Sequence, residues 1–600
     1  MLLPDRELTE GPEASQGWGA RRVLHPSGRP WLVGDWANDD LVVAKAPHGA
    51  IAIMGVSSIT SGQLADCLNS PSPRQRLATL ARRSAGSFYV LASVNGATWG
   101  HGTASGVCQL FHGRRNDVCA VSNSASMLAE FTDSPLSTSG VAAHLLAPSP
   151  PWPLDQLTIW DGVTAVDCDV AVTLSAGGEI RFTQWWSAPE AVLGAREAAS
   201  LLAEAIEDAV AARADRGSSL SCDLSGGLDS TSVAFAAARA DVALTTFREG
   251  SNDPAHDDWR WAELASEALT GRHVVVDLEG APVDFDPAPP SVSDADGPFA
   301  WQRARAGISA AAVRAAQAGS RDHLTGHGGD EVFDVGPAND HSAFQSGALR
   351  YARLSTASRL NRRWTTARHL RLLADRTSYS QWLAGAGSQD LRQDLASSPP
   401  GTSVWGSQPL LAPWMTDDAE DMVRTMLTKT PDTLAPLSPW RAQHALLSGA
   451  RQCGAAMRRC DQITREAGVR WHAPLLDDRV IEVEMATSFE ARVSPGTYKP
   501  TLVAAMVGRV PQELLGRPSK ADFSRDMYVA LRHNRAEMLR WCDDLRLGSL
   551  ELVDPQALRA SILGNHPTPP SMIQLFTTLA AESWLRSVPM RGRVYEGAKP

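Results

Sequence analysis

The chain has 600 residues, which is more than one ordinary hydrophobic core holds, so several domains are expected. Its formal net charge of −11 is spread without long acidic blocks and gives no reason to expect a nucleic-acid partner. The eight cysteines are scattered and form neither CxxC pairs nor a dense disulfide framework, which favours a cytoplasmic location. Because no apolar run approaches 18 residues and the first residues lack an apolar signal core, we expect no membrane association.

Residues 1–190 are predicted to form a β-rich domain. Short runs of β-branched or alternating residues, separated by turns, predict strands at 31–33, 41–44, 50–55, 87–94, 118–122 and 170–174. Helical patterns occupy 74–83 and 140–146, and the proline-rich stretch 148–153 predicts a loop over a surface edge. Near residue 190 the hydrophobic period becomes helical, which places the domain boundary there.

Residues 191–600 are predicted to form an α/β domain with a mainly parallel sheet flanked by helices. Strands alternate with helices at 218–224, 231–240, 242–247, 258–269, 273–278, 301–318 and 323–325. A ligand is expected beyond the carboxyl ends of such strands. A helical insertion is predicted near 340–430, and its many arginines form either a solvated face or a surface that docks an acidic peptide.

Two glycine-rich turns, each directly after a predicted strand, carry the candidate chemistry. The first, Ser225-Gly226-Gly227-Leu228-Asp229-Ser230, opens a helix, where backbone N–H groups and the helix dipole favour an anion. It lacks the lysine of a Walker A loop. The second runs from Gly326 to Glu331 and carries Asp330. In a parallel sheet both turns can lie at the same edge, so Asp229 and Asp330 are predicted to share a Mg²⁺ ion bound to ATP phosphates.

These motifs, together with HAPLLDDRVIEV at 472–483, Lys499 and GRPSKADF at 516–523, resemble the synthetase domain of the asparagine synthetase family. That family includes β-lactam synthetases and lasso peptide cyclases. The resemblance implies ATP and Mg²⁺ as cofactors and a pyrophosphate-releasing adenylation. It implies these nucleotide-binding residues: Leu224, Ser225, Gly226, Gly227, Asp229, Ser230, Phe247, Thr325, Gly326 and Lys499. It also implies that Asp229 and Asp330 bind metal, and that the catalytic residues are Lys520, His327, Asp330 and Glu331. The stretch around 516–526 is expected to be a mobile lid over the site.

The first 190 residues are similar in layout to a glutaminase domain of the N-terminal-nucleophile type. The family's glutaminase nucleophile is a cysteine directly after the initiator methionine, but here position 2 is Leu2 and no cysteine precedes Cys67. We therefore expect a degenerate glutaminase-like domain that supplies no ammonia. The attacking amine is then expected to belong to the substrate itself.

Two positions indicate which members of the asparagine synthetase family this chain resembles most. His327, within GHGGDE, is similar to the second motif of lasso cyclases, and an imidazole there either takes a proton from the attacking amine or only shapes the turn. Arg470 stands where asparagine synthetases carry an acid, which indicates either a carboxylate-binding role or altered packing beside the nucleotide.

Three functions remain open on these residues. The first is a lasso peptide cyclase, which adenylates an Asp or Glu side chain of a linear core peptide and closes a macrolactam with the peptide's amine. A leader-peptide-binding protein and a leader protease would be its partners. The second is a β-lactam-type or asparagine-synthetase-like amide ligase acting on a small molecule. The third is a non-catalytic scaffold, which the presence of Asp229, Asp330 and Lys520 disfavours.

Overall fold

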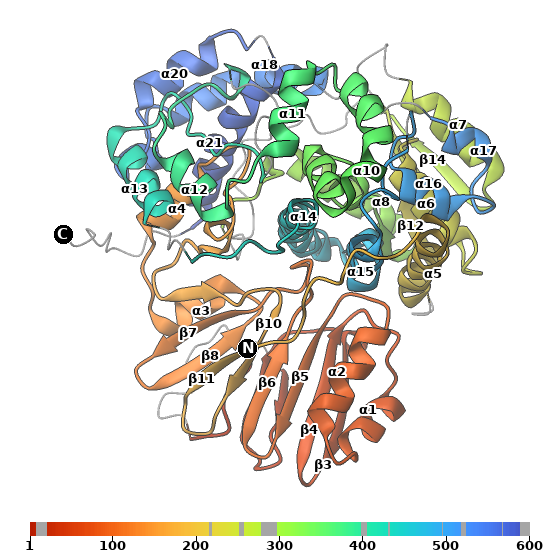
Figure 1. Ribbon diagram of the computed structural model, residues 1–600. Coiled ribbons are helices and arrows are strands. Elements are labelled where there is room, and N and C mark those ends of the chain that lie inside the picture. The colour runs from red at the N-terminus through yellow and green to blue at the C-terminus, as the bar shows by residue number, and fades with distance from the viewer. Residues whose placement is uncertain are drawn as a thin grey trace.

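The structure is a computed structural model and describes residues 1–7, 21–214, 219–250, 257–277, 297–397, 405–429, 433–494, 496–517, 524–566 and 568–588. Figure 1 shows a β-rich N-terminal half on one side and a helix-rich C-terminal half on the other, with one long helix, α14 (Arg441–Thr464), close to the junction. The predicted α/β class is confirmed. Among the described residues, no helix combines the length and apolar character that crossing a membrane requires.

The N-terminal half packs antiparallel sheets against each other. The larger sheet contains β3 (Leu41–Ala46), β4 (Gly49–Gly55), β5 (Phe88–Val94), β6 (Ala97–His101), β10 (Val170–Leu174) and β11 (Ile180–Gln184), in the order β11-β10-β6-β5-β4-β3. Facing it are β1 (Arg21–Leu24), β2 (Pro30–Gly34), β7 (Phe111–Arg115), β8 (Val118–Ser122) and β9 (Val163–Ala165). Side chains of both sets form one buried cluster that includes Trp31, Leu91 and Val172. The alternation of apolar residues in the strand sequences produces this shared core.

Three helices pack against these strands: α1 (Ser61–Leu68), α2 (Pro73–Arg83) and α3 (Ala125–Thr132). A fourth, α4 (Thr138–His144), packs instead in a buried cluster with helices of the C-terminal half, as Figure 1 shows. The helices predicted at 74–83 and 140–146 are confirmed by α2 and α4, whereas α1 and α3 had no counterpart in the sequence analysis.

The proline-rich loop does not cover an outer edge as expected. Tyr379 donates a hydrogen bond to the carbonyl of Trp152 at 2.6 Å, and Ser149 donates to Gln452 of α14 at 2.9 Å. Its polar groups find these partners in the C-terminal half, so the loop packs between the two halves.

The C-terminal half is built on a five-stranded sheet in which every neighbouring pair of strands is parallel. Its order is β14 (Arg272–Val276), β13 (Leu244–Glu249), β12 (Ser219–Asp223), β15 (Ser320–Leu324) and β16 (Arg470–His472). The crossovers use α6 (Leu228–Ala238), α7 (Asp258–Ala268) and α8 (Arg305–Gln317), and α5 (Ala195–Ala214) packs nearby. Parallel strands require such connections, and they leave β12 and β15 as neighbours. Both glycine turns therefore leave adjacent strands at the same edge.

The remaining helices all belong to the C-terminal half. They are α9 (Gly329–Phe333), α10 (Pro337–Asn361), α11 (Thr366–Ala374), α12 (Tyr379–Gly387), α13 (Asp417–Thr428), α15 (Asp478–Ala486), α16 (Pro500–Met506), α17 (Gln512–Leu515), α18 (Ser524–Trp541), α19 (Arg546–Ser549), α20 (Pro555–Leu563) and α21 (Pro569–Ser587). Leu383, Val423 and Leu575 share one buried cluster, so the predicted insertion packs against helices near the chain's end. Within the insertion, Arg362 donates to Asp340 and lies over the ring of Trp364, which gives that arginine a role within the fold.

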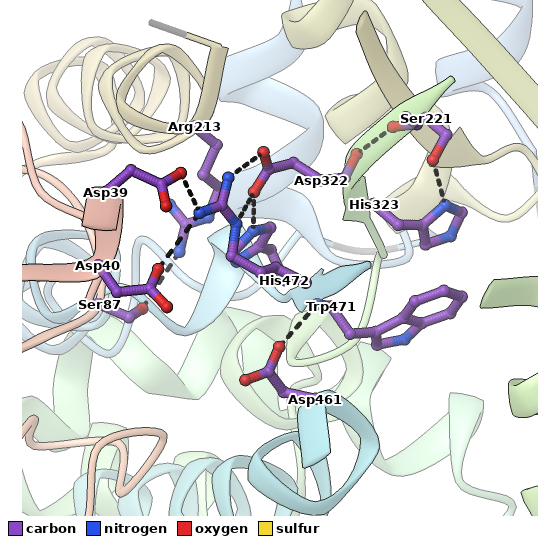
Figure 2. Close-up of polar contacts among 12 residues, drawn as sticks. Asp39, Asp40, Ser87, Arg213, Ser221, Asp322, His323, Asp461, Trp471 and His472 are labelled. Carbon is purple, nitrogen blue, oxygen red and sulfur yellow. Dashed lines mark hydrogen bonds and ion pairs between the residues drawn. The ribbon is translucent and has the colours of Figure 1, made fainter. Parts of the chain in front are cut away.

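A buried cluster of charged residues joins the N-terminal half to the C-terminal half next to strands β15 and β16. Figure 2 shows Asp39 and Asp40 of the N-terminal half on one side and Asp322 and His472 of the C-terminal half on the other. Arg470 joins them: it donates to both carboxylate oxygens of Asp322 at 2.7 and 2.6 Å, to Asp39 at 2.6 Å and to Asp40 at 3.2 Å. The carboxylate-substrate interpretation of Arg470 is therefore wrong, because its guanidinium is already occupied by three carboxylates.

A second buried contact joins the same halves. Arg213 of α5 donates to both oxygens of Asp477, at 2.9 and 2.7 Å, and the hydroxyl of Ser87 donates to Asp477 at 2.8 Å. The backbone N–H of Gly86 adds a further bond at 2.9 Å. The Asp477 carboxylate receives donors from both halves, so it joins α5 to the segment that leads into β5 of the N-terminal half.

The pH dependence of stability follows from Asp322. Burial alone would raise its pKa, but hydrogen bonds and charges from His472 and Arg470 outweigh burial and hold the pKa well below the ordinary value of 3.8. A depressed carboxylate pKa stabilises the fold above the unfolded value, and this stabilisation disappears as the pH falls through the folded value. We expect Asp322→Asn to lower the free energy of unfolding by a constant amount from pH 7 to about 4, with the difference shrinking below that. Unfolding in denaturant at a series of pH values measures this, and a difference that vanishes between pH 7 and 5 would contradict it.

Candidate active site

The first glycine turn is shaped by contacts that tolerate no side chain at Gly226. Gly226 has φ of +87°, and a Cβ there would lie 2.2 Å from the carbonyl oxygen of Asp258. Gly227 then caps α6, while the hydroxyls of Ser225 and Ser230 lie 2.9 Å apart across the turn. The backbone N–H of Gly227 donates to Ser225 at 3.3 Å. The turn is therefore a compact, hydroxyl-rich cup at a helix N-terminus, which suits an anion.

The second turn packs directly against the first. A Cβ at Gly326 would lie 2.5 Å from the backbone nitrogen of Ser230, and one at Gly329 would lie 2.3 Å from the carboxyl carbon of Asp229. Gly328 adopts φ of +91° beside Leu476. Glycine at these places is thus what lets the two turns approach closely enough to form one site.

Lys499 joins the acidic residues of the two turns. Its ammonium donates to Asp229 Oδ2 at 2.5 Å and to Asp330 Oδ1 at 2.7 Å, and Tyr498 donates to Asp330 Oδ1 at 3.0 Å. The side chain of Lys499 is fully buried, whereas those of Asp229 and Asp330 are 15% and 45% exposed. The buried cation holds two carboxylates together and leaves part of each accessible.

The two turns and this charged group line one cavity of about 250 Å³. Its wall includes Ser225, Gly227, Asp229, Ser230, Gly326, His327, Asp330, Glu331, Tyr498 and Arg517. The structure therefore brings together most of the residues that the sequence analysis assigned to nucleotide, metal and catalysis. The site lies where the fold predicts a ligand, beyond the carboxyl ends of β12 and β15.

The other predicted residues occupy several positions. Thr325 is buried, and its hydroxyl donates to the carbonyl of His472 at 3.1 Å, so it supports the turn from beneath. Phe247 and Leu224 are buried and joined by a backbone hydrogen bond of 2.8 Å. Gly226 lies in the turn without lining the cavity. Lys520 lies outside the described residues, as does most of the expected lid.

The two remaining catalytic candidates lie on the cavity wall. The ring of His327 lies 4.6 Å from that of Trp301, which fixes one face of the imidazole. Burial raises the pKa of Glu331, and the nearby Asp330 carboxylate adds to that rise. Both side chains can therefore face a reactant, and neither is enclosed in the ion pairs described above.

The sequence analysis missed two side chains that shape the site. Arg517 is buried and donates to the carbonyl of Gly226 at 2.5 Å and to Asp258. It fixes the first turn from behind, while Tyr498 fixes Asp330 from the other side. Arg517 lies within the GRPSK motif and Tyr498 directly precedes Lys499, so both were adjacent to residues that had drawn attention.

The residues present fit a magnesium ion bound together with a nucleotide. Mg²⁺ is commonly held by one or two carboxylates plus phosphate oxygens and water, and Asp229 and Asp330 supply two carboxylates at one place. No cluster of three or more potential ligands occurs in the described part of the chain, so phosphates would have to complete the coordination. This agrees with a metal that arrives with ATP.

Leu2 shares a buried core cluster with Cys108 and Cys119. Leu2 is buried, pairs with Val121 through its backbone N–H at 2.6 Å, and borders a cavity of about 90 Å³ beside Trp36 and Asn123. None of the described residues lining this cavity is a cysteine. All eight cysteines of the chain are buried with free thiols.

A family model described as asparagine synthase matches residues 201–586. The chain therefore belongs to the asparagine synthase family, and this membership indicates an ATP-dependent enzyme that forms carbon–nitrogen bonds. No curated protein matches the chain.

Solved structures with some likeness include the allosteric regulatory enzyme of purine biosynthesis and the glutamine phosphoribosylpyrophosphate amidotransferase of B. subtilis complexed with ADP and GMP. Identities are 8% and 9%, and TM-scores are 0.18 and 0.17. Each match covers 41% of this chain and less than two thirds of the other, 63% and 65% respectively. At these scores the likeness supports no conclusion about this chain.

We expect Gly226→Ala to weaken the binding of MgATP at least about tenfold, or ~1.4 kcal/mol. The added Cβ would collide with the carbonyl of Asp258 and force the turn out of shape. Calorimetric titration of MgATP measures the effect. Gly307→Ala is the matched control, because Gly307 lies in α8 with nothing within 4 Å of an added Cβ. Equal affinities for both variants would contradict the role given to the turn.

Proposed function

We propose that this protein activates a carboxylate of its substrate with ATP and joins it to an amine of the same substrate, releasing AMP and pyrophosphate. The observation that carries the proposal is the pairing of Asp229 and Asp330 through Lys499 beneath two glycine turns. Such a site offers hydroxyls, backbone N–H groups and two carboxylates to a metal–pyrophosphate leaving group. It offers no Walker A lysine for transfer of the γ-phosphate.

The residues divide the work as follows. Ser225, Ser230 and the N-terminus of α6 would hold the β- and γ-phosphates and stabilise charge on the departing pyrophosphate. Asp229 and Asp330 would hold Mg²⁺, which when bound would neutralise phosphate charge as that group leaves. Lys499 keeps both carboxylates in place, so that they do not repel each other before the nucleotide arrives.

The bond-forming step needs a base and protection from water. His327 lines the cavity and is held against Trp301, so its imidazole can accept the proton of the attacking amine. Lys520 would balance negative charge at the α-phosphate, and the 516–526 stretch would close over the site. Loss of AMP from the activated carboxyl then completes the amide.

The finer proposal is a lasso peptide cyclase, in which an Asp or Glu side chain of a linear core peptide is activated and the peptide's N-terminal amine closes the ring. The GHGGDE form of the second motif supports this, and so does the leucine in place of a cysteine at position 2. An enzyme without its own ammonia supply needs a substrate that carries the amine. A leader-peptide-binding protein and a leader protease are the proposed partners, and the cytoplasm is the proposed location.

A small-molecule ligase of the β-lactam-synthetase type is the second candidate. The described cavity of about 250 Å³ supports it, because that volume lies at the small end of ligand pockets. The two candidates share the chemistry and differ only in the substrate.

Incubation with MgATP and candidate substrates separates these functions. We expect AMP together with a peptide product lighter by one water, detected by mass spectrometry. Turnover of a small amino acid but no peptide would favour the second candidate. Absence of AMP with any substrate would support a non-catalytic scaffold, and full turnover by Lys520→Ala would remove the role proposed for that lysine.

A further inference from the structure

A second cavity, of about 330 Å³, lies between the N-terminal half and α14. One wall comes from the N-terminal half, including Gln109, His144 and the proline-rich loop, and the opposite wall comes from residues 449–459 of α14. None of the residue roles described above requires a space at this place. The cavity is large enough to hold an amino-acid side chain together with part of its backbone.

This cavity adjoins the candidate active site. Glu331 lines both cavities, so the two spaces lie on either side of one side chain. Trp301 lines the second cavity while its ring packs 4.6 Å from that of His327, which lines the first. The second cavity is therefore a direct neighbour of the reacting centre.

The charge of the lining favours an anion. Three arginines of α14, namely Arg451, Arg458 and Arg459, line it, against two carboxyl groups, Asp155 and Glu331. Burial lowers the pKa of His144 to about 4, so this histidine is neutral near pH 7. Burial also raises the pKa of Asp155 to about 6. Among the described lining residues, positive charge exceeds negative charge.

One nitrogen of the Arg451 guanidinium is available to bind a ligand. The residue is only 4% exposed. Its Nη2 donates to Asp169 at 3.1 Å and its Nε to the carbonyl of Ala104 at 3.4 Å, but its buried Nη1 has no hydrogen-bond partner among the described residues. A buried N–H group without an acceptor is unfavourable, and a guanidinium prefers a planar carboxylate that two of its N–H groups can contact.

We propose that the second cavity is a subsite for a carboxylate of the substrate other than the one that is activated, bound chiefly by Arg451 with Arg458 and Arg459. The proposal rests on the ligase function above and adds a substrate requirement to it: a second acidic group near the reacting carboxylate. A carboxylate fits better than a phosphate, because the planar guanidinium of Arg451 matches a planar carboxylate.

The test uses glutarate as the probe, titrated calorimetrically into the full-length protein without nucleotide. Glutaramide is the uncharged counterpart, and inorganic phosphate is the competing anion. We expect glutarate to bind at least tenfold more tightly than either. Tighter binding of phosphate, or equal binding of glutaramide, would overturn the carboxylate assignment.

Three variants test whether glutarate binds in the second cavity. Arg451→Gln removes the charge and is expected to weaken glutarate binding at least tenfold. Because Arg451 also contacts Asp169 and could be needed for folding, Ala455→Leu provides a second route: it fills the cavity and leaves every charge in place. Arg441→Gln is the matched control, since Arg441 is a buried arginine of the same helix that pairs with Asp375 away from the cavity. Its glutarate affinity should stay within twofold of the native value.

Binding of MgATP and AMP formation by the same proteins keep this proposal distinct from the ligase function. If the native protein forms AMP but glutarate binds Arg451→Gln and Ala455→Leu as tightly as the native protein, the subsite is wrong and the ligase function stands. If glutarate binding depends on Arg451 but no substrate yields AMP, the anion site stands and its assignment to a ligase substrate falls.

Discussion

Replacing Asp229 by asparagine is expected to lower the rate of AMP release about 10³-fold, or ~4 kcal/mol of transition-state stabilisation. The substitution keeps the shape of the side chain, so the close contact with Gly329 is preserved. It removes one of the two negative charges available to Mg²⁺. The metal would then bind less tightly and stabilise the departing pyrophosphate less. Stability should change much less than activity, because Lys499 keeps its bond of 2.7 Å to Asp330.

Asp334→Asn is the matched control for this experiment. Asp334 follows α9 in the second motif's own segment, but it is exposed and does not line the cavity. Its AMP release should stay within about twofold of the native rate, as expected for a surface substitution. Steady-state AMP release by both variants, beside their thermal unfolding, measures the contrast. Equal activity of Asp229→Asn and the native protein would show that this carboxylate does not hold the metal.

The second large effect concerns stability. Arg470→Met is expected to lower the free energy of unfolding by about 4 kcal/mol, because removing one partner of a buried ion pair leaves charge without compensation. Asp322 would lose both guanidinium contacts inside a site from which its carboxylate is completely shielded. His472 would keep its 2.7 Å contact with Asp322, as Figure 2 shows, but one imidazole does not replace the two guanidinium bonds that are lost.

Arg509→Met is the control for the stability measurement. Arg509 pairs with Glu207 at 2.9 Å, but their side chains are 30% and 29% exposed. Partly exposed pairs contribute less than about 1 kcal/mol, so this variant should unfold close to the native midpoint. Urea unfolding followed by far-ultraviolet circular dichroism compares the two. Similar midpoints for both variants would contradict the role of Arg470 in joining the halves.

The sequence predicted the parts of the fold that depend on local pattern. Alternating apolar residues indicated the strands at 50–55 and 170–174, and the run around Asp258 indicated a helix, because periodicity records which face is buried. The strand β16 escaped prediction. Its three residues, Arg470 to His472, include two polar side chains whose burial depends on Asp322, nearly 150 positions earlier. Because the partner that permits this burial is far away in the sequence, the residues around β16 show no pattern that predicts a strand.

The candidate site also contains features that the sequence predicted and features that it did not. Glycine turns after strands predicted a shared site because β12 and β15 are neighbours in a parallel sheet. The bridge made by Lys499 was not predictable in its geometry, since it depends on the left-handed backbone of that residue at the start of α16. Of the two interpretations of Arg470, carboxylate binding was wrong for a related reason: a substituted charge in a motif does not reveal its partners, and here they include Asp39 and Asp40 of the other half.

The measurement that tests the central claim most directly is the exchange of radioactive pyrophosphate into ATP. A protein that activates a carboxylate at this site should incorporate labelled pyrophosphate into ATP only when a carboxylate substrate is present. Asp229→Asn should lose the exchange, whereas Asp334→Asn should retain it. Substrate-dependent formation of ADP and phosphate, with no exchange of pyrophosphate, would contradict the account.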